Sequence, residues 1–117
     1  MIGEVILPWP VKELSPNARV HWAVKAAATK SARTNAGWAT KAAGIPKLPS
    51  MPLKLTVTYN PPSRRKLDGD NLISRLKPAF DGIADAIGVD DSKFKIEPPI
   101  RAEPVKHGAV KITLEVA

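Results

Sequence analysis

The chain has 117 residues, 44% of them hydrophobic, which suits one globular domain spanning residues 1–117. It has no cysteine, which excludes disulfides and thiolate catalysis, and no apolar run near the roughly 20 residues of a membrane span, so we expect a cytoplasmic protein without membrane contact. Lysine and arginine number 18 against 11 acidic residues, and the net charge of +7 favours a polyanion such as nucleic acid or serves solubility alone.

The first third of the chain predicts a strand followed by a long helix. Residues 2–7 are rich in β-forming side chains and predict a strand, and Pro8 and Pro10 keep the backbone extended after it. Between these prolines, Trp9 either packs on the sheet edge or stacks on a nucleobase. The sequence Ser-Pro-Asn at 15–17 is typical of a helix N-terminus. The Ala-rich segment 18–43 that follows predicts a helix, with Gly37 as a candidate break or kink. Its apolar residues recur near helical spacing at Val20, Val24, Ala27, Ala28, Trp38 and Ala42.

This predicted helix carries only positive charge. No acidic residue occurs from Ser15 to Met51, whereas salt-bridged surface helices mix both signs. The pattern favours a helix that faces DNA over one that is merely solvated. Its cations are Lys25, Lys30, Arg33 and Lys41.

The rest of the chain predicts a second helix among three strands. Residues 53–59 alternate apolar and polar side chains, as in a half-buried strand. A helical pattern runs over 71–87, where Pro78 either kinks the helix or separates its first turn, and Gly88 ends it. Segments 93–97 and 109–116 predict the last strands. The order β-α-β-α-β-β indicates an α/β fold, with two main helices packed on a small mixed sheet. The second helix presents one apolar face, formed by Leu72, Leu76, Phe80, Ile83 and Ile87.

Acidic residues occur in two turns, one at each end of this second helix. Three cations run directly into Asp68, Gly69 and Asp70, and a second acidic pair follows at Asp90 and Asp91. In extended backbone, residues two apart project to the same side, so the first two carboxylates would reach one ion. Clustered carboxylates repel unless neutralised, and a hard divalent cation such as Mg²⁺ or Mn²⁺ is the usual agent.

The structural alternative is that these residues only build turns. Asp70 then caps the helix, Asp68 forms an Asx-turn, and the 90–91 pair is a solvated turn. The metal hypothesis requires the helix to pack back across the sheet, so that both acidic turns converge at one sheet edge.

Four segments, in order, resemble the RusA family of Holliday junction resolvases of bacteria and phages. They are the opening Ile-Leu-Pro-Trp-Pro at 6–10, the Ser-Pro-Asn at 15–17, the basic run into Asp-x-Asp-Asn at 68–71, and Lys-x-x-Phe-Asp at 77–81 followed by Asp-Asp at 90–91. The resemblance covers essentially the whole chain.

The resemblance implies a small homodimer that binds Mg²⁺ and nicks opposed strands of four-way junction DNA during recombination and repair. The family's catalytic, Mg²⁺-binding carboxylates fall on Asp68, Asp70 and Asp91. Its catalytic lysine falls on Lys77, seven residues after Asp70, where the enterobacterial type has a spacing of four. Arg75 is therefore a rival for that role.

Further residues are expected to contact DNA or to support the fold. Asp81 and Asp85 are interpreted as structural or salt-bridged, and His21 and His107 as surface residues, although a general-base histidine is the alternative. Two other functions stay open: a protein that binds branched DNA without cleaving it, and a metal-dependent nuclease on other branched DNA such as flaps. The expected DNA contacts are Arg64, Arg65, Lys66, Asn71, Arg75, Lys25, Lys30, Arg33 and Asn17.

Overall fold

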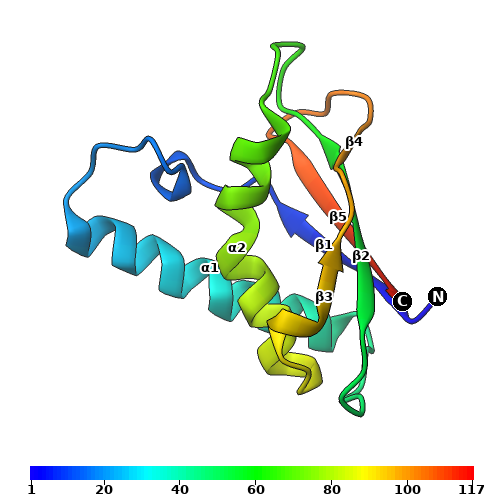
Figure 1. Ribbon diagram of the computed structural model, residues 1–117. Helices are drawn as coiled ribbons and strands as arrows, with labels where there is room; N and C mark the ends of the chain where they lie inside the picture. Colours follow the sequence, from blue (N-terminus) through cyan, green and yellow to red (C-terminus); the bar gives the residue numbers. More distant parts are fainter.

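The computed structural model describes all residues 1–117 and shows a five-stranded mixed sheet with two helices on one face (Figure 1). The strand order is β1-β5-β2-β3, and β4 also pairs with β2. β5 lies antiparallel to both β1 and β2, whereas β3 and β4 run parallel to β2. The α/β class predicted from the sequence is confirmed. The strands are β1 (Gly3–Pro8), β2 (Leu53–Asn60), β3 (Phe94–Ile96), β4 (Ile100–Arg101) and β5 (Ala109–Val116).

The core lies between the sheet and α2 (Gly69–Ile87). β2 and β5 alternate buried and half-buried side chains, as the period of two predicts. The apolar face expected of the second helix is buried throughout, from Leu72 to Ile87. Pro78 lies inside α2 without ending it, and Gly88 ends the helix in the left-handed conformation, at a φ of 72°. The helix starts two residues before the predicted boundary.

The first helix departs most from the sequence prediction. α1 (Trp22–Ala42) begins four residues later than expected, because the His21 side chain, not the Ser-Pro-Asn turn, caps it by accepting from the Ala23 amide. The helix runs through Gly37 without a break. Its large apolar residues, Trp22 and Trp38 among them, are exposed. The buried positions of α1 are Ala36 and Thr40.

Small residues bring α1 and α2 unusually close together. A Cβ added to Gly82 of α2 would collide with the Arg33 carbonyl oxygen and lie 3.0 Å from the Ala36 Cβ. Close packing over alanine and glycine leaves no room for large apolar side chains, so they point outward from α1 instead. The helical spacing of the large residues therefore does not mark the buried face of α1.

One bidentate ion pair joins the two helices at this crossing. Arg33 Nε and Nη2 donate to the two carboxylate oxygens of Asp85 at 2.6 and 2.8 Å, so the salt-bridged role expected of Asp85 is confirmed. The hydrogen bonds from Arg33 lower the pKa of Asp85.

Arg33→Gln is expected to reduce thermal stability in a pH-dependent way. A carboxylate whose pKa is depressed by folding stabilises the fold above its unfolded pKa, and this contribution is lost as pH falls through the folded value. Both side chains are half exposed, so we expect Tm to fall by only about 2–4 °C at pH 7. The difference should close as the pH falls through the lowered pKa of Asp85. Calorimetry from pH 7 to acid pH measures the Tm of the native chain and of Arg33→Gln. Lys30→Gln, which removes the same charge, is the control. A Tm difference that stays constant across pH would contradict the ion-pair origin.

Neither helix is both long and apolar enough to cross a membrane. Two short 3-10 turns complete the fold, η1 (Lys12–Leu14) after β1 and η2 (Asp91–Lys93) before β3. Trp9 packs against Tyr59 of β2, with ring centroids 6.2 Å apart. A Cβ at Gly108 would lie 2.9 Å from the Trp9 Cβ, so the glycine admits this tryptophan.

Candidate functional site

The first acidic turn caps α2. Asp68 is the N-cap residue, and its Oδ1 accepts a hydrogen bond from the Asp70 amide at 2.9 Å. Because α2 already includes Gly69 and Asp70, the extended-chain geometry assumed from the sequence does not apply. Asp68 lies outside the helix and turns its carboxylate onto the backbone of the first turn, so one of its oxygens is occupied there. The Asx-turn expected at Asp68 in the structural alternative is confirmed, whereas the capping role expected of Asp70 is wrong, because Asp68 is the residue that caps α2.

The second acidic turn folds back onto the middle of α2. Asp90 caps η2 by accepting from the Ser92 amide at 2.8 Å, which leaves the side chain of Asp91 directed at the helix. Lys77 Nζ lies 3.1 Å from Asp91 Oδ2 and 3.9 Å from Asp81 Oδ1. The fold thus joins Lys77 and Asp91, which the sequence places fourteen residues apart.

The pKa values of Lys77, Asp81 and Asp91 are shifted by the contacts among these three side chains. The hydrogen bond to Asp91 raises the pKa of Lys77, and the same bond is the main reason that the pKa of Asp91 is lowered. Partial burial, followed by a hydrogen bond with Asp91, raises the pKa of Asp81. Lys77 is therefore held as a cation between two carboxyl groups, one ionised and one more easily protonated.

Asp70 shares one side of α2 with this cluster. Residues seven apart differ by only about 20° around a helix, so Asp70 and Lys77 project in nearly the same direction, with Ser74 between them. The axial separation between Asp70 and Lys77 is about 10 Å, or two turns. One side of the helix therefore presents, in order, a carboxylate, a hydroxyl, an ammonium and the carboxyl of Asp81.

These residues do not fit a resident Mg²⁺ as they are folded. No three carboxylate or imidazole side chains gather closely enough to hold a metal ion. Asp91 is neutralised by Lys77, and one oxygen of Asp68 is engaged by a backbone amide. Of the expected triad, Asp91 is the member that contacts the lysine.

A cationic loop stands beside the N-terminus of α2. The connection between β2 and α2 projects from one end of the molecule (Figure 1) and carries three exposed cations, Arg64, Arg65 and Lys66. Arg101 of β4 donates to the backbone oxygens of Arg65, at 2.9 Å, and Ser63, at 3.4 Å. Sequence reasoning missed Arg101, although parallel pairing of β4 with β2 brings it to the loop.

The other expected contacts occupy the opposite side of α2. Asn71 Nδ2 donates to Ser15 Oγ at 3.1 Å, and the backbone amide of Asn17 donates to the same hydroxyl. Arg75 donates to the Pro10 carbonyl oxygen, and burial lowers its pKa. Since Arg75 and Lys77 project about 200° apart, Lys77 and not Arg75 is the cation beside Asp91.

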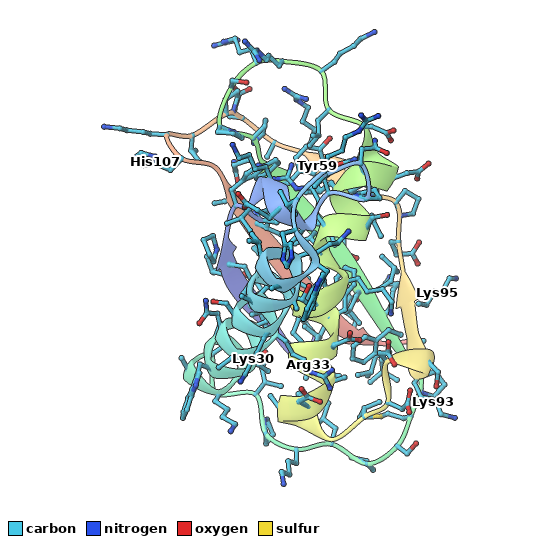
Figure 2. All side chains as sticks on the ribbon, turned by 90° about the vertical axis from the view of Figure 1, so that its left-hand side faces the viewer. Lys30, Arg33, Tyr59, Lys93, Lys95 and His107 are labelled. Atoms are coloured by element: carbon cyan, nitrogen blue, oxygen red, sulfur yellow. The ribbon has the colours of Figure 1, made fainter.

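The cations of α1 differ in their exposure and in whether they form an ion pair. Lys30 is exposed, whereas Arg33 is committed to Asp85 at the junction of the helices (Figure 2). Lys25 is half exposed. Of the two histidines, His21 caps α1 and His107 is exposed in the turn before β5.

Comparison with known proteins gives one clear relative. No protein-family model matches the chain. A protein of Xylella fastidiosa (strain Temecula1), described as an uncharacterized protein, is 46% identical over 112 residues, which cover 92% of this chain and 72% of that protein. Identity of this extent indicates a common fold and ancestry, and the chain belongs to the same family as the Xylella fastidiosa protein.

Proposed function

We propose that the chain is a structure-selective DNA endonuclease of the RusA type, which resolves four-way junctions in recombination and repair. The observation that carries the proposal is the contact between Lys77 and Asp91. It joins two of the residues on which the family resemblance rests, from separate segments, on the side of α2 that also bears Asp70. The side chain of Lys77 is also largely exposed, so a phosphodiester at this surface could reach its ammonium group.

Lys77 would act on the charge that develops when a phosphodiester is cleaved. Its ammonium group, kept protonated and oriented by Asp91, would donate to a phosphoryl or leaving oxygen. Asp70 would help position an attacking water from the same side of the helix. Mg²⁺ or Mn²⁺ dependence is a prediction of the resemblance, and it would require Asp91 to be released from Lys77.

The cationic loop 64–66 would guide DNA toward this side of α2. The loop lies at the N-terminal end of α2, the end at which Asp70 is also found. Contacts of this kind, with those of Lys25 and Lys30 on α1, neutralise phosphates and release counterions, so binding would weaken steeply with salt. A homodimer would place two such sites on the approximately two-fold junction.

The test compares binding with nicking on defined substrates. The native chain is incubated with a synthetic four-way junction, a flap and a linear duplex, with Mg²⁺, Mn²⁺ or a chelator. We expect paired nicks in the junction, dependent on the divalent cation, with linear duplex untouched. Tight junction binding without nicking at any cation level would instead favour the branched-DNA-binding protein. Preferential cutting of flaps would favour the other nuclease.

A further inference from the structure

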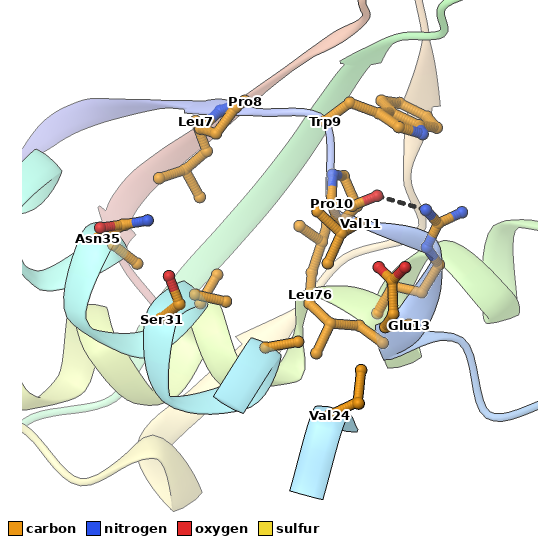
Figure 3. A pocket seen from close by; sticks show the side chains of 16 residues that line it. Leu7, Pro8, Trp9, Pro10, Val11, Glu13, Val24, Ser31, Asn35 and Leu76 are labelled. Atoms are coloured by element: carbon orange, nitrogen blue, oxygen red, sulfur yellow. Dashed lines mark hydrogen bonds between the residues drawn. The ribbon is translucent and has the colours of Figure 1, made fainter. Parts of the chain in front are cut away.

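Two hollows of different character border α1, each with a volume of about 330 Å³. The first lies between α1, the end of β1 and η1 (Figure 3), and its lining is mainly apolar, with one arginine that already donates to the Pro10 carbonyl oxygen. The second lies beside the C-terminal half of α1, against α2, and polar and charged side chains dominate its lining. We call it the Trp38 groove, and its main lining residues are Lys30, Arg33, Thr34, Trp38, Lys41 and Asp85.

The Trp38 groove combines an exposed indole with two lysines that have no acidic partner. Trp38 is 66% exposed, and the Lys41 ammonium lies 5.1 Å from the centroid of its ring. Lys30 and Lys41 are both exposed, and neither forms an ion pair. The third cation, Arg33, is neutralised by Asp85. The two lysine charges are therefore available to an anionic ligand, and the ring keeps most of its surface in solvent.

The groove residues follow one side of α1 in a regular order. Lys30, Thr34 and Lys41 fall within about 40° of one another around the helix, and Trp38 projects about 40° beyond Thr34. The two lysines are about 16 Å apart along the helix axis, with the indole between them. A cation at each end and a ring between them suit a short polyanion that also carries planar groups, and a DNA strand of a few nucleotides has both features.

The groove also adjoins the site around Lys77. Arg33 and Asp85, which line the groove, also line a further hollow that includes Asp81 and Asp91. Asp91 is the residue that pairs with Lys77. A strand with one phosphate at Lys77 would therefore extend over the crossing of the two helices into the groove without leaving the protein surface.

We propose that the Trp38 groove binds an unpaired nucleotide of single-stranded DNA, with the base stacked on Trp38 and the flanking phosphates at Lys30 and Lys41. Inside a duplex both faces of a base are covered by its neighbours, so only an unpaired base can stack on a protein ring. Stacking on an aromatic side chain in a positive groove is a general way of binding single strands without sequence preference. The inference rests on the proposed function, because a strand opened at the branch point of a junction would supply the unpaired nucleotide.

The contact between Trp38 and Lys41 does not define a site by itself, because side chains three residues apart often meet on a helix surface. The groove, the second lysine and the neighbouring Lys77 site set this tryptophan apart. Trp22 provides the comparison within the same helix. It is 76% exposed, yet no cation lies over its ring and it lines neither hollow. Trp22→Ala is therefore the matched control for Trp38→Ala.

Binding of a short single strand, without divalent cations, tests the groove apart from any cleavage. A dye-labelled thymidine strand of about eight nucleotides is titrated with the protein, and fluorescence anisotropy measures the affinity. Trp38→Ala should weaken binding about tenfold, the effect of losing one stacked base. Trp38→Phe, which keeps an aromatic face, should retain most of the affinity, and Trp22→Ala should leave it unchanged.

An abasic strand of the same length and charge is the control on the DNA side. The native chain should bind it about as weakly as Trp38→Ala binds the intact strand, and Trp38→Ala should bind both strands alike. Equal binding of intact and abasic strands by the native chain, or equal losses in Trp38→Ala and Trp22→Ala, would overturn the stacking site. A chain that binds the strand through Trp38 but never nicks a junction would overturn the nuclease proposal alone.

Discussion

Gly82→Ala is expected to lower the free energy of unfolding by about 2–4 kcal/mol, the upper range for overpacked sites. The new Cβ would meet the Arg33 carbonyl oxygen, which belongs to the backbone of a packed helix and cannot rotate away. The two helices must then separate, which also strains the pairing of Arg33 with Asp85. Chemical denaturation followed by circular dichroism measures the loss.

Gly37→Ala provides the matched control, since Gly37 faces Gly82 from the other helix. A Cβ there would lie 3.4 Å from the Gly82 carbonyl oxygen, an ordinary contact distance. Alanine also favours helix over glycine by up to about 1 kcal/mol, so this variant should be neutral or more stable. Equal destabilisation by both substitutions would contradict the geometry of the crossing.

Lys77→Gln is expected to have opposite effects on cation binding and on catalysis. Removing the ammonium frees Asp91 and Asp81, so affinity for Mg²⁺ or Mn²⁺ should rise about tenfold from the loss of charge repulsion. Nicking of a four-way junction should fall at least about 100-fold, because the positioned cation is absent. Titration calorimetry and a cleavage assay measure the two effects. Lys95→Gln, which removes an exposed cation from β3, should change neither.

Asp70→Asn separates the role of the carboxylate from that of the lysine. It should also abolish nicking, but cation affinity should not rise as it does in Lys77→Gln, because Asp70 lies two helical turns from the Lys77–Asp91 pair and the pair stays intact. Junction binding should persist, because the cationic loop is intact. If Asp70→Asn nicks as well as the native chain, Asp70 has no part in the reaction.

The sheet and α2 were predictable because their side-chain periods are simple. Strand residues 53–59 alternate in sequence, and the structure buries every second one, from Leu53 to Tyr59. In α2, five apolar residues recur at helical spacing and a glycine follows at the C-terminus. Each pattern reflects burial of one face, so local sequence sufficed.

The placement of α1 could not be predicted in this way. Its contact with α2 uses Ala36 and Gly37, which carry no strong hydrophobic signal. The conspicuous residues, Trp22 and Trp38, face outward instead. Where a helix packs through its smallest residues, a count of large apolar side chains selects the wrong face.

The acidic cluster was predictable only in part. Recurrence of acidic turns at both ends of one helix suggested convergence, and Asp91 does return to that helix. The partner that it meets is Lys77, two turns beyond Asp70, because η2 and β3 set the depth of the return. Such a distance depends on strand register, which the sequence of the turn does not encode.

Arg101 has a consequence for how tightly the 63–66 segment can hold a ligand. By holding two carbonyl oxygens of the 63–66 segment, it fixes the main chain while the three basic side chains stay in solvent. An anion arriving there meets a recognition element that is already shaped, so little conformational entropy remains to be lost on association. Loss of that tether would leave the three basic side chains of the loop in place and raise the entropic cost of ordering them on a ligand.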